Sequence, residues 1–403
     1  MLHVGRCLRS SCSRGPAGIS LESLAKLFYL QRGPYAAAAG RLNSTALVSA
    51  EELAACRPPA QYLECLDEMV SIAGQRPSLS GKVHTRRMPN QMGELPCNSC
   101  GRYFEMEAFA RTRTVCKDCS CMHASNHYRT LRGFVLKMLT SARARAKRKG
   151  LTHNLQLQDV LNMLLKQGGR CAYSGIAMEM LVPFSHWRMS LERLDNSEGY
   201  VKDNCALVAA EFNSPDYSRC KGVRAEDIHG TAQWSSEKVC MVGCVDTTAV
   251  SLSQLEADVG RATRRPNIST AFGDYHRSYI RTLRGKAKSL ANNARNSSSR
   301  RQRTSEIEYT DILQMLLKQG GRCFYSGIPL QYDQPHVDWA MSLERLNNSC
   351  GYVRDNCVLI AAEFNTTDLS KNAKGEVYGS SQWSRAKVMH VWGQAGCDRF
   401  SQS

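Results

Sequence analysis

Long apolar runs are missing from this sequence, and so is a regular cysteine framework. The two most apolar stretches, 24–30 and 35–40, are short and interrupted, whereas a membrane-spanning helix needs roughly 18 or more consecutive apolar residues. The 18 cysteines are irregularly spread over 403 residues, which argues against a disulfide scaffold and favours a reducing compartment. We therefore expect reduced thiols and no association with a membrane.

Acidic residues are also few. Asp and Glu total 36 against 53 Lys and Arg, a formal net charge of +17, and the pI is about 9.2. A clustered cation excess is typical of proteins that neutralise phosphates, and a merely soluble basic surface is the alternative. We expect DNA or RNA as the partner. The choice between them stays open, because the sequence has no base-stacking motif such as an RNP aromatic pair.

The first 50 residues form a separate region by composition. They contain six cations and the single acid Glu22, with many serines and alanines. This composition is typical of an organellar transit peptide, and a disordered basic leader of a nuclear protein is the alternative. We therefore predict a mitochondrial or other organellar location, with a nuclear location as the second reading. The six cations are Arg6, Arg9, Arg14, Lys26, Arg32 and Arg41.

A duplication accounts for most of the remaining chain. The motif RTLRG at 129–133 returns at 281–285, and EFN at 211–213 returns at 363–365, both at an offset of 152. The segment GTAQWSSEKV at 230–239 returns as GSSQWSRAKV at an offset of 149. Self-similarity of this kind indicates repeated structural units. The predicted organisation is a leader at 1–50, a short helical or linker segment at 51–90, a zinc ribbon at 91–125, module 1 at 126–240, a linker at 241–274, module 2 at 275–390 and a tail at 391–403.

Both modules show the same predicted elements. In module 1, the apolar spacing of 134–150 and 157–167 predicts two helices, the second ending at Gly168-Gly169. A knuckle (CAYSGI), a strand at 189–194, a turn and a second apolar segment follow. Gly199 and its counterpart Gly351 are expected to adopt a positive φ in that turn.

Four cysteines predict a metal site. Cys97 and Cys100, and then Cys116 and Cys119, form two C-x2-C pairs separated by 15 residues. Such pairs make knuckles whose thiolates hold one tetrahedral ion, and soft sulfur ligands select zinc. Four thiolates leave no open position, so the expected site is structural. Cys121 is read as a bystander, and the aromatic residues Phe104 and Phe109 as the small core of the ribbon, which should need the metal to fold.

The order of these motifs resembles a known family. A C-x2-C pair of knuckles, a YRT-type basic helix, a GGRC-x-Y-S-G knuckle and the segment SLERLDNS-x-GY-x-x-DN together resemble phage-type HNH (His-Me finger) endonucleases with a zinc ribbon in front. The resemblance covers about 97–240 and again 275–390. It implies an α+β fold, with a four-cysteine ribbon and two tandem ββα-metal modules that carry basic helices.

The resemblance also implies site residues. Glu192 with Asn213, and Glu344 with Asn365, would hold Mg²⁺ or Mn²⁺. Asn204 and Asn356 lie nine positions before the second ligand and would brace the loop.

In both copies, Arg193 and Arg345 replace the histidine that serves as general base in the family. Arginine cannot accept a proton at neutral pH, though it can hold a phosphate. His186 and His336 are out of register with each other and are read as loop residues, while Cys171, Cys205, Cys323 and Cys357 are read as core.

Cations in the two basic helices are the expected phosphate contacts: Arg143, Arg145, Lys147, Arg148, Lys149, Arg295, Arg300, Arg301 and Arg303. Three functions remain open. The protein could be a metal-dependent endonuclease, a nuclease-derived binding protein, or a structural component of an organellar ribonucleoprotein such as a mitochondrial ribosome.

Overall fold

The computed structural model describes residues 49–75, 87–110, 114–214, 234–244, 250–268, 274–334, 336–366 and 382–393. Within them the protein is mixed α+β, with eleven α-helices and three two-stranded antiparallel sheets. The predicted α+β class is confirmed. Residues 1–48 and the tail from 394 onward lie outside the described residues, so the leader and its location stay predictions.

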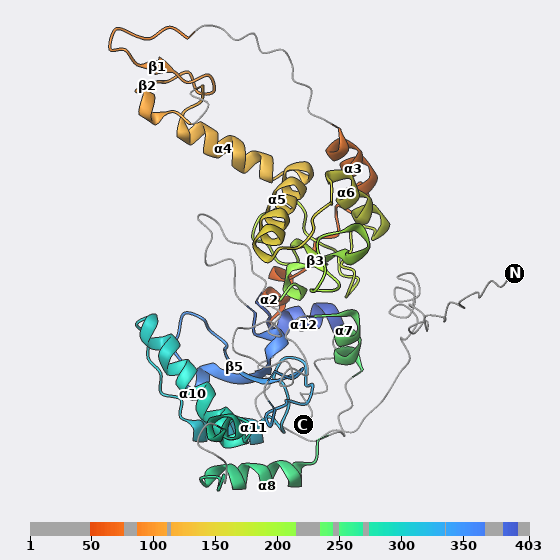
Figure 1. Ribbon diagram of the computed structural model, residues 1–403, viewed down its shortest axis with the longest axis vertical. Coiled ribbons are helices and arrows are strands. Elements are labelled where there is room, and N and C mark those ends of the chain that lie inside the picture. The colour runs from red at the N-terminus through yellow and green to blue at the C-terminus, as the bar shows by residue number, and fades with distance from the viewer. Residues whose placement is uncertain are drawn as a thin grey trace, which may run out of the picture. The chain divides into compact units, whose positions relative to one another are not determined.

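Each repeat contains three packed helices in the same order (Figure 1). The first helix of each triplet packs against the third, and the second packs against both. The triplets are α3 (Leu66–Gly74), α5 (Leu131–Lys149) and α6 (Leu157–Lys166) in the first repeat, and α8 (Leu252–Thr263), α10 (Leu283–Arg300) and α11 (Tyr309–Lys318) in the second. Helices α4 (Lys117–Tyr128) and α9 (Tyr275–Ile280) precede α5 and α10 respectively.

The RTLRG motif starts the second helix and caps the first. Thr130 is the N-cap of α5, because its hydroxyl accepts from the Gly133 N–H at 3.1 Å. Arg132 donates to the Ala73 carbonyl at the end of α3 at 2.8 Å. The negative end of the helix dipole also favours a cation at this position. Arg284 does the same for α8. The repeated motif is therefore structural.

Helices α3 and α8 extend the repeat toward the N-terminus. They share a second offset, 189 residues, which relates Leu66 to Leu255 and Val70 to Val259; all four side chains are buried. This offset exceeds the main offset of 152 by 37 residues. The segment between the first and second helices of the triplet is therefore 37 residues longer in the first repeat, and it contains the four-cysteine ribbon. Residues 241–274 are therefore more than the predicted linker, since they contain a helix packed on α10 and α11.

One β-hairpin follows each triplet. Strand β3 (Met189–Arg193) pairs with β4 (Cys205–Ala209), and β5 (Met341–Arg345) pairs with β6 (Cys357–Ala361) in the same register, so that Glu192 faces Ala206 and Glu344 faces Val358. The second strand of each pair, β4 or β6, is short and apolar and is buried on both sides, as expected for a strand inside a core.

The helix expected directly after the second strand is not found among the described residues. A single 3-10 turn (Ala210–Phe212) occupies that position, and Ala362–Phe364 does so in the second repeat. The chain leaves the first turn at Asn213, whose side chain bonds back to β3. The next described helix, α7 (Ser236–Gly243), begins after residues that the structure does not describe.

The prediction of a positive φ at Gly199 and Gly351 is wrong, because neither is among the residues of positive φ. These glycines are required by close packing instead. A Cβ on Gly199 would lie 2.1 Å from the Thr152 carbonyl oxygen, and one on Gly351 would lie 2.2 Å from that of Thr304. Any side chain would therefore push the turn away from the segment that follows the basic helix.

The two repeats share one hydrophobic core because they exchange their last helices. Lys238 at the start of α7 donates to the Glu363 carboxylate of the second repeat at 3.0 Å. In return, Lys387 of α12 (Arg385–Trp392) donates to Glu211 of the first repeat at 2.8 Å. Burial raises the pKa of Glu363, and Lys238 partly offsets that rise. The boundary at 240 therefore does not enclose a self-contained module.

Candidate functional site

The four predicted zinc ligands lie together. The sulfur atoms of Cys97, Cys100, Cys116 and Cys119 are all within 4.8 Å of one another. A two-stranded hairpin, β1 (Leu95–Pro96) and β2 (Tyr103–Phe104), carries the first pair, and the start of α4 carries the second. Sequence alone predicted this set, and its geometry is compatible with a structural metal such as zinc.

Local hydrogen bonds prepare the cysteines for a metal. The backbone N–H groups of Ser99 and Cys116 donate to the Cys97 sulfur at 3.4 and 3.3 Å. Burial opposes ionisation of Cys97, but these and other N–H bonds outweigh it and lower its pKa to about 6. The pKa of Cys119, in the first turn of α4, is raised instead: a hydrogen bond with Ser99 lowers it, but hydrogen bonds with the other three cysteines, together with burial, outweigh that effect. The donors therefore suit a cation with a preference for sulfur.

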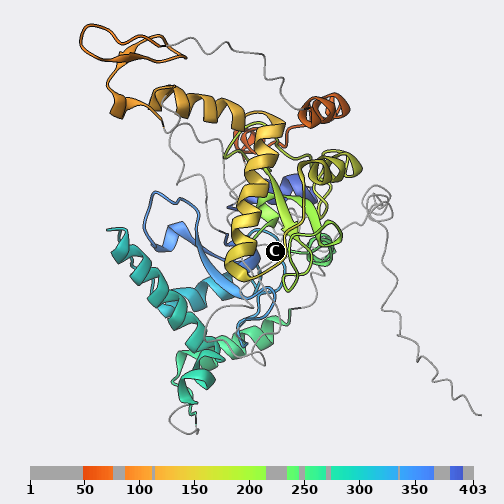
Figure 2. The ribbon, with the colours of Figure 1, turned by 45° about the horizontal axis from the view of Figure 1, so that its top comes forward.

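The rest of the ribbon matches its predicted construction. Phe109 is buried beside the cysteines and contacts Phe104 edge to face, with ring centroids 6.3 Å apart, and the Arg87 guanidinium lies 5.1 Å from the Phe109 ring centroid. Cys121 is exposed and outside the cluster, as expected. Figure 2 shows the hairpin of the ribbon at the N-terminal end of α4, the helix that precedes the basic helix α5 in the chain.

The arginines at the position that the resemblance assigns to the general base bind their own turn. One nitrogen of Arg193, Nη1, donates to the carbonyls of Asn196 at 2.9 Å and Glu198 at 2.7 Å, and Nη2 donates to the Asn196 side chain at 2.8 Å. Arg345 repeats this arrangement with Asn348 and Cys350. Both arginines are about 95% buried, so their guanidinium groups act as turn braces inside the fold.

The predicted ligands Glu192 and Glu344 are buried as well. The Gln382 amide donates to Glu344 at 2.7 Å, and the same Gln382 accepts from Asn348 at 2.9 Å. Gln382 therefore joins the carboxylate to the turn that Arg345 braces. Sequence reasoning missed this residue, although the QW pair shared by GTAQW and GSSQW was a signal for it. Among the described residues, the four-cysteine set is the one cluster of three or more His, Cys, Asp or Glu side chains that could hold a metal.

The predicted asparagines all make internal hydrogen bonds. Asn213 donates from its amide to Ser190 Oγ at 2.9 Å and to the Leu191 carbonyl at 3.1 Å, and Asn365 makes the same pair of bonds in the second repeat. Because a carbonyl can only accept, the atom of Asn213 that faces β3 is the amide nitrogen.

Asn204 spans the turn through the Asp195 and Gly199 carbonyls at 2.9 and 3.0 Å. Asn356 does the same with Asn347 and Gly351. The arginines and these asparagines therefore hold the same loop of each repeat from two sides.

The cations of the basic helices divide into two groups. Arg143, Lys147 and Arg148 are exposed on the side of α5 that faces away from its buried stripe, and no hydrogen bond or ion pair of theirs is found within the described part of the chain. Arg145 is instead half-buried, with its guanidinium 5.7 Å from the Tyr200 ring centroid.

In the second repeat, Arg295 pairs with Glu308 at 3.2 Å and Arg303 bonds to the Asn348 carbonyl. Arg300 donates to Asn296, one helical turn back, and Arg301 is exposed. Lys149, the last cation of α5, is exposed as well. Of the two basic helices, α5 thus presents the clearer cationic surface.

The remaining predictions concern the core. Cys171, Cys205, Cys323 and Cys357 are buried among apolar side chains, as predicted. His186 lies in the loop before β3, with its Nε2 atom 3.9 Å from the Cys56 sulfur, and His336 occupies the equivalent loop with a positive φ. Both histidines are therefore loop residues, as predicted.

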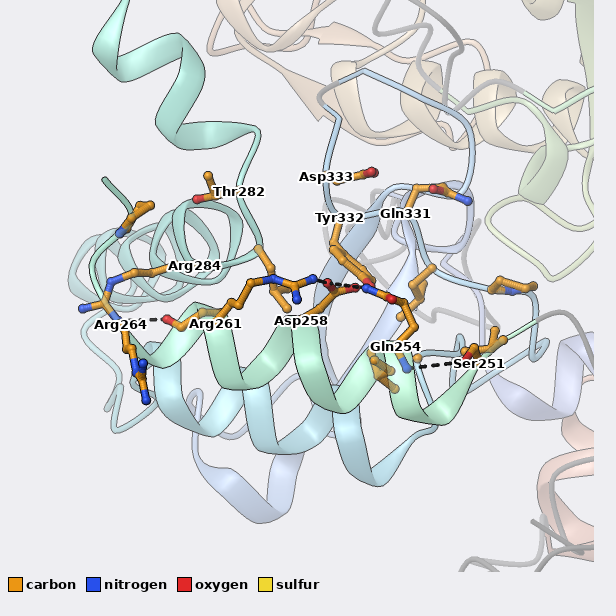
Figure 3. A pocket seen from close by; sticks show the side chains of 18 residues that line it. Ser251, Gln254, Asp258, Arg261, Arg264, Thr282, Arg284, Gln331, Tyr332 and Asp333 are labelled. Carbon is orange, nitrogen blue, oxygen red and sulfur yellow. Dashed lines mark hydrogen bonds and ion pairs between the residues drawn. The ribbon is translucent and has the colours of Figure 1, made fainter. Parts of the chain in front are cut away.

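A cavity of about 620 Å³ lies beside α8 (Figure 3). Two of its three arginines have protein partners: Arg261 pairs with Asp258, and Arg284 donates to the end of α8 and to the Tyr309 hydroxyl. Tyr332 donates to Asp258 at 2.9 Å across the middle of the cavity. The polar side chains in the middle of the cavity therefore bond to one another.

None of the helices in the described ranges is both long and apolar enough to cross a membrane. Comparisons with protein families, with curated proteins and with solved structures returned no match for this chain.

Proposed function

We propose that this protein binds nucleic acid through two repeats derived from HNH nuclease modules, and that these repeats no longer cleave their ligand. The observation that carries this proposal is the use of Arg193 and Arg345. In both repeats the residue at the general-base position is a buried brace for its own turn. Cleavage of a phosphodiester needs a group that can accept a proton from water, and this position supplies none.

The metal position also lacks a strong donor set. Each repeat would offer Mg²⁺ one carboxylate, Glu192 or Glu344, and an asparagine whose amide nitrogen is bonded to β3. A hard cation prefers several charged oxygen ligands. A repeat without a general base and with few Mg²⁺ ligands is suited to binding nucleic acid and not to cleaving it. In this proposal the retained fold holds the basic helices in place.

Nucleic-acid binding is supported by where the charge lies. The net charge of +17 includes an exposed group on α5, Arg143, Lys147 and Arg148. Helix α4, whose first turn belongs to the four-cysteine ribbon, directly precedes α5 in the chain. Cations on one face of a helix, beside a metal-stabilised ribbon, suit the regularly spaced phosphates of a nucleic acid.

A nicking experiment tests the proposal. Supercoiled plasmid and a structured RNA would be incubated with the full chain and Mg²⁺ or Mn²⁺, and binding would be measured on the same samples by gel shift. We expect retarded nucleic acid without strand breaks, for wild type and for the double variant Glu192→Gln/Glu344→Gln alike.

Cleavage by wild type that disappears in the double variant would establish the endonuclease reading instead. Cleavage that persists in the double variant would show contamination or a different active site. A complete absence of both binding and cleavage, with every substrate tested, would overturn the proposal as a whole.

A further inference from the structure

The exchange between the repeats is reciprocal. Lys238 donates to Glu363 while Lys387 donates to Glu211. The tryptophan four residues before each lysine also donates its indole N–H to the opposite repeat. Trp234 donates to the Glu363 carbonyl at 3.1 Å, and Trp383 donates to the Glu211 carbonyl at 3.0 Å. When residue i contacts j′ and i′ contacts j, the two units are related by a two-fold rotation and not by a translation.

Contacts between equivalent positions locate the axis. Trp234 and Trp383 occupy the same place in the two repeats, at the offset of 149, and their ring centroids lie 5.5 Å apart. The equivalent of Trp392 is Gly243, and a Cβ on that glycine would lie 3.5 Å from the Trp392 ring. Only points close to a two-fold axis touch their own symmetry mates. The pseudo-two-fold axis therefore passes between α7 and α12.

The same relation applies to the basic helices. Helices α5 and α10 bury equivalent stripes: Leu131, Val135, Leu139, Ala142 and Ala146 in one, and Leu283, Ala287, Ala291, Ala294 and Ser298 in the other. Equivalent outward positions are cationic in both helices, namely Arg143 and Arg295, Arg148 and Arg300, and Lys149 and Arg301. The pseudo-two-fold axis therefore relates two cationic surfaces, of which that on α5 is the stronger.

We propose that the ligand is a double-stranded nucleic acid, contacted by α5 and α10 at two places related by this axis. The inference rests on the proposed function. The antiparallel strands of a duplex create local two-fold axes, which proteins with two-fold symmetry match. A single strand has a direction and suits repeats related by translation, as in repeat proteins that read one base per unit. The reciprocal contacts favour the duplex.

Fluorescence anisotropy with the full chain tests this inference. The probes are duplex DNA, duplex RNA and the separate strands of each, with duplexes from about one helical turn, roughly 10 base pairs, to about four turns. We expect at least one duplex to bind about tenfold or more tightly than its strands. Affinity should rise by about a hundredfold or more once a duplex is long enough to engage both helices.

Three charge variants identify the contacts. Arg143→Ala/Arg148→Ala in α5 and Arg295→Ala/Arg300→Ala in α10 should each lower the slope of log affinity against log salt by about 2 on long duplexes. The matched control Lys166→Ala/Lys318→Ala removes the same charge from equivalent exposed positions of α6 and α11 and should leave the slope unchanged. On the shortest duplex, which engages one helix at a time, the α10 pair alone should have little effect, because the stronger surface on α5 holds that duplex.

Equal or tighter binding of the single strands would overturn the duplex inference while leaving nucleic-acid binding intact. So would an α10 pair that behaves like the control on every duplex. Absence of binding to all probes would instead overturn the proposed function from which the inference starts.

Discussion

Arg193 and Arg345 show how a residue's surroundings decide its role. Each guanidinium makes two hydrogen bonds to turn carbonyls and one to an asparagine side chain. Each also lies over an aromatic ring, with Arg345 4.9 Å from the Tyr352 ring centroid. The planar fork of arginine suits this set of acceptors, whereas the single ammonium of lysine cannot reach all of them.

A conservative change at this position should therefore be costly. We expect Arg345→Lys to lower the free energy of unfolding by about 2–3 kcal/mol, because buried hydrogen bonds to a charged group are lost and their acceptors are left unsatisfied. Urea unfolding measures the effect. The control is Arg170→Lys, an exposed arginine that bonds to one carbonyl, which should cost little. If Arg345→Lys matched this control and instead reduced the salt dependence of binding, Arg345 would be a phosphate contact.

At the scale of elements, the ribbon depends on its metal more than on its own packing. Its apolar cluster consists of Cys97, Phe109, Cys116 and Cys119, with three partly buried neighbours. So small a core stabilises little by burial alone. Four sulfurs within 4.8 Å also repel one another as thiolates unless a cation lies between them.

We predict about one zinc ion per chain, bound by these four cysteines. Elemental analysis of the purified protein should find it, and Cys97→Ser/Cys100→Ser should lose it together with the protease resistance of residues 87–128. Cys121→Ser is the matched control and should keep both. A chelator should release the ion and expose the ribbon while the hairpins of the two repeats stay folded. Two or three ions per chain, or none, would contradict the assignment.

At the scale of the whole molecule, the two exchanged ion pairs are unequal. Lys238 also pairs with Asp338 at 2.5 Å. The equivalent of Asp338 in the first repeat is His186, at the offset of 152, so no second carboxylate comes from that position to Lys387. Lys387 is 1% exposed and Glu211 is fully buried, and breaking such a pair leaves a buried charge poorly compensated.

The inequality gives a prediction. Glu211→Gln should destabilise the protein by about 3–5 kcal/mol, whereas Glu363→Gln should cost clearly less, since Lys238 keeps Asp338. Thermal unfolding followed by tryptophan fluorescence suits the test, because Trp234 and Trp383 lie at the exchange. The double variant Glu363→Gln/Asp338→Asn should then approach the cost of Glu211→Gln. Equal effects of the two single changes, with no extra loss in the double variant, would show that the pairs do not hold the repeats together.

Short-range features of this protein could be predicted from its sequence. The spacing of Cys97, Cys100, Cys116 and Cys119 predicted one cluster, and the helices and strands of each repeat lie close to where the apolar periodicity placed them. These features depend on residues a few positions apart, whose hydrogen bonds and packing are set by local backbone geometry. The burial of Cys171, Cys205, Cys323 and Cys357 was predicted as well.

Tertiary structure alone decided which distant groups meet. Lys387 reaches Glu211 across 176 positions and Lys238 reaches Glu363 across 125, and no local pattern records such pairings. The same applies to Arg193, whose charge suits a phosphate as well as a turn, until burial fixes its partners. Gly199 was mistaken for a turn glycine because the Thr152 carbonyl that excludes a side chain there lies 47 residues away. A charged or polar group can be satisfied by many partners, and only the packed fold determines which one it has.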